Sequence, residues 1–407
     1  MKPEYRRLLT DLLTLPTAPF CEEHVIAYIR RWVADRPGLT LTEDRYGNLQ
    51  IRVRRNPPRG SRPLVLAAHM DHPGFEAEGM IRRDTVRAFW RGWVAPEYFK
   101  GTGVRFWVDG AWVRGRITAT KVADYRGRPR VQTASIRVPK PVPPGSIGMW
   151  DLPDPAVRGS RLYARGIDDV AGVAAVLAAT DVIAKRREPV NFIAQLNRAE
   201  EVGFVGAIAA CRDKVLPRNA LIVSVETSSE LAGGKMGEGP ILRVGDLSSI
   251  FTPDLTAFCR RVAEDLVART TPKAGRKGRA SRRTTRPAPF RFQRKLMDGG
   301  TCEAAAYCGF GYEASGICIA LGNYHNMDRT REKIASEFVD LNDWDDMVRW
   351  FVELAIAAPS YRPGDPKVDE MLDFLHKRWH PLLEGSVDRV RGKVRSEKGE
   401  VRKQKRR

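Results

Sequence analysis

Residues 64–71 read LVLAAHMD, an apolar run that ends in a histidine and an aspartate. The five apolar residues predict a short buried strand. Outward from this strand, further strands and helices alternate along the chain. Strands are expected at 191–196, 220–225 and 316–321, and helices at 170–184, 203–211, 255–268, 304–308 and 341–358. This alternation indicates an α/β fold in which flanking helices cover a mixed central sheet.

Residues 76–159 have a different pattern. Short β-like runs lie between Gly and Pro turns there, which predicts a small β-barrel inserted into the α/β domain. The α/β domain would then be discontinuous, at 1–75 and 160–360, with a basic surface insertion at about 270–290. Residues 361–407 would form a helical segment followed by a basic disordered tail.

The net charge of +20 is concentrated in two segments. Residues 268–295 hold eleven Lys and Arg and no acidic residue, and residues 387–407 hold ten Lys and Arg against three acidic residues. These two segments therefore carry +18 of the net charge, and the rest of the chain is nearly neutral. They suit contact with nucleic acid or another acidic surface, but solvated tails that only raise solubility are the simpler interpretation.

Two absences narrow the class of protein. No run of 18 apolar residues occurs, so the sequence predicts no membrane-spanning helix. The six cysteines are scattered and contain no Cys-x-x-Cys pair, which argues against a disulfide framework and against a zinc ribbon. A reducing compartment is therefore expected, and the cytoplasm is the predicted location.

Five short polar segments follow predicted strands or lie in loops between elements. They contain His69 with Asp71, the pair Asp168-Asp169, the pair Glu200-Glu201, Glu226, and His325. Each has a structural explanation when taken alone, such as a helix N-cap for an Asp pair. Ligands of α/β proteins gather at the carboxyl ends of strands, so the five together predict a metal centre. There a carboxylate can bridge two cations, and an adjacent glutamate can act as a general base.

The order of these segments resembles that of the dinuclear-zinc aminopeptidase clan. It reads His-x-Asp, Asp-Asp, Glu-Glu-Val-Gly, an acidic residue and His. The sequence is most similar to the glutamyl and tetrahedral aminopeptidases, a metallopeptidase family also described as endoglucanase-like. Two further segments resemble motifs of that family: Gly237-Glu238-Gly239-Pro240 and Gly299-Gly300-Thr301. Members of the family also typically carry an inserted β domain. The resemblance covers roughly residues 5–358.

The resemblance implies a role for each polar residue. The implied metal ligands are His69, Asp168, Glu201, Glu226 and His325. His69 and Glu226 would bind one ion, Glu201 and His325 the other, and Asp168 would bridge the two. Glu200 would be the general base that activates a water bridged by the two ions, and Asp71 would orient His69. The ions would be zinc, with cobalt or manganese as alternatives that suit the same ligands. The implied reaction is hydrolysis of the N-terminal residue of a peptide substrate.

Several positions depart from the family pattern. His72 follows Asp71 where the family usually has Glu, and Glu226 stands where Asp is common. Cys302-Glu303 follows the Gly-Gly-Thr motif where the family has Asp-Ala, and we expect Cys302 to be a small core residue. The last motif reads Asn323-Tyr324-His325-Asn326 instead of Arg-Tyr-x-His. His72 and Glu226 keep open a related dinuclear amidohydrolase or deacylase.

Two further questions stay open at this stage. The chain could be a non-catalytic scaffold that binds nucleic acid through its basic segments. The family resemblance also implies a homo-oligomer, with the inserted domain as an oligomerisation or lid domain. Five aromatic residues of that domain suit either a subunit interface or the barrel core: Trp90, Trp93, Phe99, Phe106 and Trp107.

Overall fold

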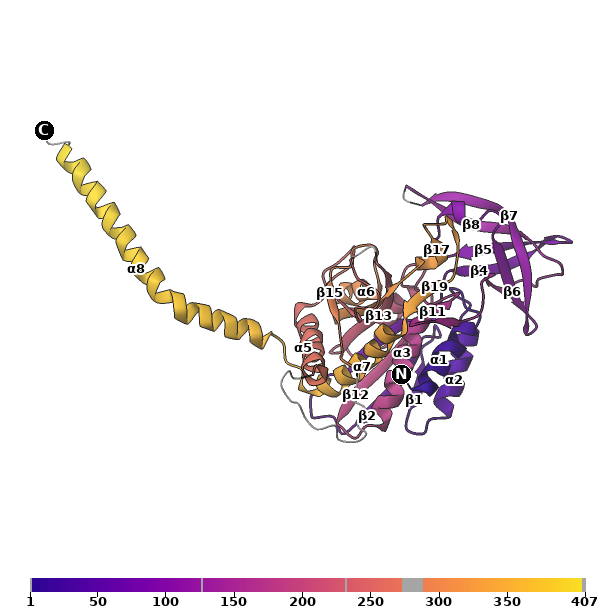
Figure 1. Cartoon of the computed structure of the whole chain (residues 1–407), viewed down its shortest axis with the longest axis horizontal. Helices are drawn as coiled ribbons and strands as arrows, with labels where there is room; N and C mark the ends of the chain where they lie inside the picture. The colour runs from indigo at the N-terminus through magenta and orange to yellow at the C-terminus, as the bar shows by residue number, and fades with distance from the viewer. Residues whose placement is uncertain (1, 126, 231–232, 273–287, 405–407) are drawn as a thin grey trace. The chain divides into compact units, whose positions relative to one another are not determined.

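The computed structural model describes residues 2–125, 127–230, 233–272 and 288–404, and beyond residue 384 it describes only the side chain of Ser386. The chain forms two compact units, at 1–361 and 362–407 (Figure 1). Most of the basic insertion predicted at 270–290 lies outside the described residues. No helix of the described part of the chain is both long enough and apolar enough to span a membrane.

A mixed eight-stranded sheet forms the centre of the larger unit. Its strand order is β1-β2-β12-β3-β13-β16-β14-β15. The strands are β1 (Thr40–Glu43), β2 (Leu49–Arg55), β3 (Leu64–His69), β12 (Val190–Asn197), β13 (Leu221–Ser229), β14 (Ile241–Arg243), β15 (Gln293–Lys295) and β16 (Glu313–Leu321). The four central strands β12, β3, β13 and β16 are parallel, and β2 joins them antiparallel to β12. The predicted α/β fold with a mixed central sheet is confirmed.

Helices cover both faces of this sheet (Figure 1). One face packs on a core that includes side chains of α1 (Pro3–Thr14), α2 (Glu23–Ala34), α3 (Val170–Lys185), α5 (Pro253–Thr270) and α7 (Leu341–Ala357). The other face packs on the shorter helices α4 (Val205–Arg212) and α6 (Glu303–Gly309). Strand β3 alternates between the two cores: Leu64, Leu66 and Ala68 face the first, whereas Val65 and Ala67 face the second. This alternation is the period of two expected for side chains on a strand.

A closed six-stranded barrel lies between β3 and α3 in the sequence. It consists of β4 (Gly74–Arg82), β5 (Thr85–Arg91), β6 (Gly103–Val108), β7 (Ala111–Tyr125), β8 (Arg128–Arg137) and β9 (Ile147–Trp150). Three of the five aromatic residues considered above, Trp90, Phe99 and Phe106, are buried in its core, whereas Trp93 and Trp107 are half-buried. The core explanation therefore holds for most of these rings, which fill the barrel and do not form an exposed interface patch.

Several short elements complete the larger unit. They are η1 (Pro96–Tyr98), β10 (Ala156–Arg158), β11 (Arg161–Ala164), η3 (Tyr324–Asn326), β17 (Met327–Asp328), β18 (Lys333–Ile334), β19 (Glu337–Asp340) and η4 (Ala358–Ser360). Strands β10, β11 and β19 form a small sheet. The smaller unit contains the helix α8 (Pro366–Gln404).

Candidate active site

The parallel register brings two predicted ligands together. Strand β3 pairs with β13 so that Ala67 lies opposite Ser224, and the same register continued by two residues places His69 opposite Glu226. Both residues then belong to the sheet face that carries α4 and α6, because side chains of a strand alternate between faces. His69 and Glu226 are buried, and His69 Nε2 lies 3.8 Å from Glu226 Oε2.

The glutamate pair reaches the same edge from the neighbouring strand. Strand β12 ends at Asn197, opposite His69, and Glu200 and Glu201 follow in the next turn. The Asp71 carboxylate accepts the backbone N–H groups of Glu200 and Glu201, at 2.9 Å and 3.1 Å. Asp71 therefore fixes the turn that carries both glutamates. The His69 ring nitrogen Nδ1 lies 3.1 Å from the Asp71 backbone carbonyl and 3.5 Å from its carboxylate.

Asp168 comes from the loop between β11 and α3. The buried Glu337 carboxylate accepts the backbone N–H groups of Ile167 and Asp168, at 2.6 Å and 3.2 Å. His72 contacts the same loop: its Nδ1 lies 2.6 Å from the Asp168 carbonyl oxygen, and its Nε2 lies 3.0 Å from Asn326 Oδ1. The peptide bond between Asp168 and Asp169 is cis.

His325 lies in the short turn η3 that follows β16. Its Nδ1 is hydrogen-bonded to the Trp93 carbonyl at 2.7 Å, which directs Nε2 toward the acidic residues. Nε2 lies 3.1 Å from Glu201 Oε2 and 3.8 Å from Asp168 Oδ2. Trp93 follows the barrel strand β5, so the inserted domain helps to orient a side chain of the α/β domain.

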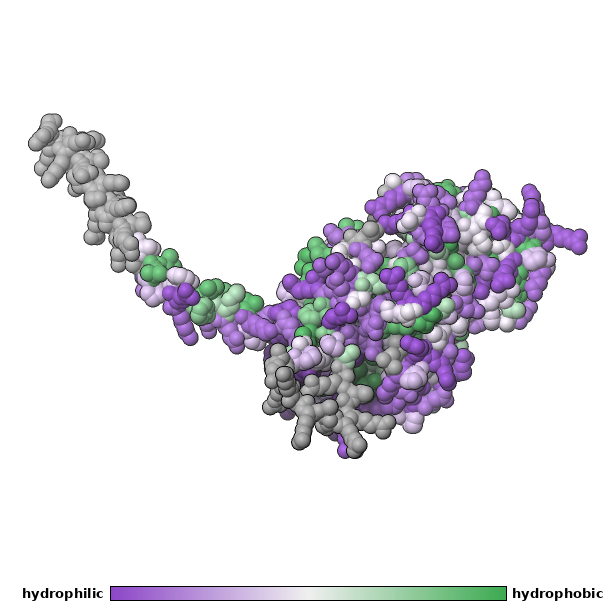
Figure 2. All heavy atoms as spheres, in the orientation of Figure 1, coloured by the Kyte–Doolittle hydropathy of each residue, from purple (hydrophilic) through white to green (hydrophobic). Residues whose placement is uncertain are grey.

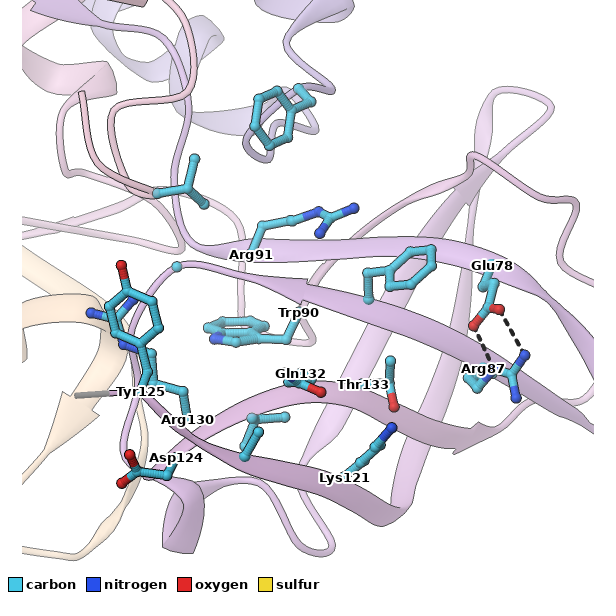
Figure 3. A pocket seen from close by; sticks show the side chains of 16 residues that line it. Glu78, Arg87, Trp90, Arg91, Lys121, Asp124, Tyr125, Arg130, Gln132 and Thr133 are labelled. Carbon is cyan, nitrogen blue, oxygen red and sulfur yellow. Dashed lines mark hydrogen bonds and ion pairs between the residues drawn. The ribbon is translucent and has the colours of Figure 1, made fainter. Parts of the chain in front are cut away.

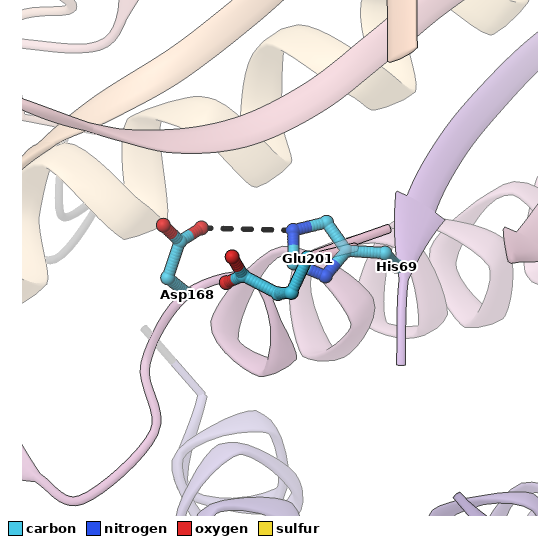
Figure 4. A group of neighbouring side chains, drawn as sticks. All are labelled: His69, Asp168 and Glu201. Atoms are coloured by element: carbon cyan, nitrogen blue, oxygen red, sulfur yellow. Dashed lines mark ion pairs between the residues drawn. The ribbon is translucent and has the colours of Figure 1, made fainter. Parts of the chain in front are cut away.

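Asp168 lies between the two histidines. Its Oδ1 is 3.7 Å from His69 Nε2, and its Oδ2 is 3.8 Å from His325 Nε2 (Figure 4 shows the His69 side). Ligands bound tetrahedrally at about 2.0–2.1 Å lie about 3.3 Å apart, close to these separations. One oxygen of Asp168 therefore faces each histidine, which is the arrangement of a bridging carboxylate.

The unpartnered atoms of the cluster fit divalent cations. Asp168 Oδ1, Glu201 Oε1 and Glu226 Oε1 are buried without a hydrogen-bond partner among the described residues. Leaving such atoms unpaired is costly, and a cation would satisfy them. Two overlapping groups have ligand atoms within 4.8 Å of one another: His69, Asp168 and Glu201, and His69, Glu200 and Glu226.

The pKa values of the cluster show an excess of buried negative charge. Burial raises the pKa of Glu200 well above its usual range, and the nearby Glu226 and Glu201 carboxylates add to the effect. Burial alone would lower the pKa of His325, but the Glu201 and Asp168 carboxylates outweigh it and raise the pKa to about 9. Without metal ions the cluster therefore retains protons, and cations would displace them on binding.

Sequence reasoning missed a layer of polar residues behind the ligands. Glu303, at the start of α6, is fully buried, and Asn197 Nδ2 lies 2.8 Å and 2.9 Å from its two oxygens and 2.8 Å from the Tyr307 hydroxyl. Burial raises the pKa of Glu303 to about 8. Only the departure from the family pattern at 302–303 marked this position in the sequence. Cys302 is buried beside Phe251 and Ala304, as expected for a small core residue.

A cavity of about 490 Å³ opens onto the predicted metal ligands. Four arginines line it together with the ligands: Arg128, Arg130, Arg243 and Arg329. Arg128 and Arg130 come from the β7–β8 hairpin of the barrel, which sequence reasoning did not connect with the site. His72 is not among the lining residues, because it is buried beneath the Asp168 loop.

Comparison with solved structures identifies the fold. The aminopeptidase APDkam598 from the archaeon Desulfurococcus kamchatkensis is 21% identical, with a TM-score of 0.68 over 88% of this chain and 96% of that chain. A TET aminopeptidase from a marine sediment archaeon of the Thaumarchaeota is 18% identical, with a TM-score of 0.68 over 88% of this chain and 100% of that chain. The TET1 peptidase of Pyrococcus horikoshii is 21% identical, with a TM-score of 0.65 over 86% of this chain and 99% of that chain. At these identities the likeness shows the shared fold.

The sequence itself identifies the family. No curated protein sequence matches the chain significantly. The family model described as M42 glutamyl aminopeptidase matches residues 47–279, more than half of the chain, including four of the five predicted metal ligands. A buried cluster of histidines and carboxylates at the carboxyl edge of the sheet is what a metallopeptidase of this kind requires. The chain therefore belongs to the M42 glutamyl aminopeptidase family and is a metal-dependent aminopeptidase.

Proposed function

We propose that the chain removes the N-terminal residue of peptides with two divalent ions, and that these ions are zinc. His69 and Glu226 would hold one ion, Glu201 and His325 would hold the other, and Asp168 would contribute to both. The observation that carries this assignment is the placement of one Asp168 oxygen near each histidine nitrogen. The alternatives cobalt and manganese suit the same nitrogen and oxygen ligands.

The residues around the ions would have different roles in hydrolysis. Two bound cations would lower the pKa of a water and polarise the scissile carbonyl. Glu200 would accept the proton of that water and deliver it to the leaving amine. Glu200 Oε2 lies 3.9 Å from His69 Nε2, and Glu200 lines the catalytic cavity next to Glu201, which places its carboxylate where a general base is needed. Asp71 would act indirectly, by holding the turn that carries Glu200.

Metal content and substrate range test this function together. Elemental analysis of the purified protein should find about two ions per chain. A panel of aminoacyl-nitroanilides, with N-acylated amino acids beside it, should show cleavage of the first set alone. Cleavage of only the N-acylated set would favour a deacylase. If the protein held no metal and showed no activity after addition of zinc, cobalt or manganese, a non-catalytic scaffold that binds nucleic acid would be favoured.

Arg243 supports a preference for acidic N-terminal residues. Its side chain is buried at one wall of the catalytic cavity, its Nε has no hydrogen-bond partner among the described residues, and its Nη1 lies 3.4 Å from the Ser228 hydroxyl. A guanidinium with unused donors suits the carboxylate of an N-terminal Glu or Asp.

Replacing Arg243 with Met should therefore change substrate choice. We expect kcat/KM for a glutamyl-nitroanilide to fall at least about thirtyfold, because the substrate carboxylate loses a charged partner in a buried site. A leucyl-nitroanilide should change by less than about threefold. The exposed Arg294→Met is the matched control and should leave both substrates unchanged. An equal loss for both substrates would contradict a role of Arg243 in specificity.

We also propose that the chain forms a homo-oligomer. The support comes from structures of similar fold: one relative is described as a dodecamer, and the Pyrococcus horikoshii TET1 peptidase as able to assemble into a tetrahedron or a large octahedral shell. Light scattering of the full-length protein would measure the mass of the assembly directly.

The basic C-terminal segment supports a contact with an acidic surface, such as nucleic acid. The first half of α8 exposes apolar side chains, among them Leu372, Trp379, Leu382 and Leu383 (Figure 2, green). Ten Lys and Arg follow within 387–407. Such a sequence combines cationic residues, which can bind phosphate groups, with exposed apolar side chains.

Deleting 387–407 tests this contact. Binding of the full-length protein to RNA or to anionic vesicles should weaken steeply as salt rises, and the deletion should lower the low-salt affinity at least about tenfold. Nitroanilide hydrolysis serves as the control and should be unchanged, because the deleted residues lie outside the unit that holds the active site. If no binding is found, or if the deletion does not change the affinity, the segment would only raise solubility.

A further inference from the structure

A second cavity, of about 650 Å³, lies on the barrel next to the catalytic cavity. It is bounded by the end of β5, by the β7–β8 hairpin and by Phe20 of the loop between α1 and α2 (Figure 3). Tyr125, Arg130 and Val202 line both cavities, so the two adjoin. Val202 directly follows Glu201, so the second cavity begins one residue away from the metal ligands.

The barrel strands separate at this cavity. Strands β5 and β8 pair only as far as Phe89 and Thr133. Beyond that pair β5 stays with β4 up to Arg91, whereas β8 stays with β7 back to Arg128. Among the described residues, the edge of β8 over 128–132 that faces β5 therefore has no strand partner. An extended peptide can add to such an edge through main-chain hydrogen bonds.

The lining suits a peptide that ends in a carboxylate. Phe20, which is 48% exposed, and the half-buried Phe89 offer apolar contacts, and the Arg91 guanidinium lies over both rings, at 5.8 Å and 4.8 Å. Lys121 and Arg130 also line the cavity, and neither forms an ion pair within the described part of the chain. Arg130 stacks on the Tyr125 ring at 4.5 Å, and its Nε is buried without a hydrogen-bond partner among the described residues.

The neighbouring cations are already engaged. Arg87 is paired with Glu78 (Figure 3), and Arg91 lies 3.1 Å from Glu76. Lys121 and Arg130 are therefore the cations of the groove that remain for a ligand. Two acidic residues also line the cavity: Glu78 is the partner of Arg87, and Asp124 accepts the backbone N–H of Gly127 in the hairpin turn.

We propose that this groove binds the part of the peptide substrate that follows the scissile bond, in an extended conformation. The proposal rests on the aminopeptidase activity. With the N-terminal residue at the metal centre, the chain passes Val202 and runs along β8, advancing about 3.3 Å per residue. Phe20 and Phe89 contact its apolar side chains, and Lys121 binds its C-terminal carboxylate or an acidic side chain.

A series of peptides with one N-terminal residue, from dipeptide to hexapeptide, tests the groove in the full-length protein. We expect kcat/KM to rise about tenfold along the series, through a lower KM. Lys121→Glu should raise KM for the hexapeptide about fivefold with kcat unchanged, because a like charge replaces the partner of the carboxylate. Phe20→Ala should raise the same KM about threefold.

The controls separate the groove from the catalytic centre. An aminoacyl-nitroanilide has no peptide beyond the scissile bond, so neither variant should change its hydrolysis. Lys140→Glu makes the same charge change at an exposed residue outside both cavities and should leave every substrate unaffected. An activity that is independent of peptide length, or equal effects of Lys121→Glu and Lys140→Glu, would overturn the proposal while hydrolysis of the nitroanilide still established the enzyme.

Discussion

Replacing Glu200 with Gln should lower kcat by about 10²–10⁴-fold and leave the metal content at its wild-type value. The amide keeps the size of the side chain but cannot accept a proton from water. Glu200 lies at the wall of the catalytic cavity, 3.9 Å from His69, and its backbone N–H is held by Asp71 whichever side chain is present. Steady-state kinetics on a nitroanilide and elemental analysis of the same sample measure both quantities.

The control for this substitution is Glu238→Gln, which makes the same change at an exposed position. It should leave kcat and metal content unchanged. If Glu200→Gln retained more than about a tenth of the wild-type kcat, the proton transfer would belong to another group. If the variant lost its metal together with its activity, Glu200 would be a ligand, as its place in one of the two buried clusters also allows.

Replacing Asp168 with Asn should weaken metal binding at least about a hundredfold and abolish activity with it. An amide offers one uncharged oxygen where the carboxylate places one oxygen near each histidine, so one ion loses its ligand and both lose the bridging charge. Titration of the chelator-treated protein with zinc would give both the number of sites and their affinity.

Asp84→Asn is the matched control, because Asp84 is an exposed carboxylate of the barrel. Thermal unfolding of both variants separates loss of metal from loss of fold. Burial alone would raise the pKa of Asp168, but His69 and His325 outweigh it and lower that pKa, so the charged side chain stabilises the metal-free fold. We therefore expect the metal-free variant to remain folded but to be less stable than the metal-free wild type. Two ions bound with unchanged affinity would contradict the bridging role.

Much of the fold follows from local pattern. The apolar run at 64–68 and its counterparts form β3, β12, β13 and β16, because buried parallel strands need continuous apolar sequence. The pattern at 76–159 predicts the barrel as an insertion, but it does not predict β4 and β9 as strands. Both are interrupted by Gly or by mixed polar residues, and the barrel closes only through pairings between distant strands such as β4 with β9.

The sequence by itself determined which residues could form the metal centre. Their chemical types and their positions after strands are properties of the linear chain, and parallel strands end at one edge of a sheet. His69, Asp168, Glu200, Glu201, Glu226 and His325 do meet there.

The tertiary structure alone decided what surrounds that centre. The Trp93 carbonyl that orients His325, the Glu337 carboxylate that holds the Asp168 loop, and the buried Glu303 come from segments far apart in the sequence. The groove on the barrel likewise exists only where β5 and β8 separate. A linear pattern records the period of one strand or helix, whereas these contacts depend on how separate elements pack, and that is fixed by burial and register across the whole domain.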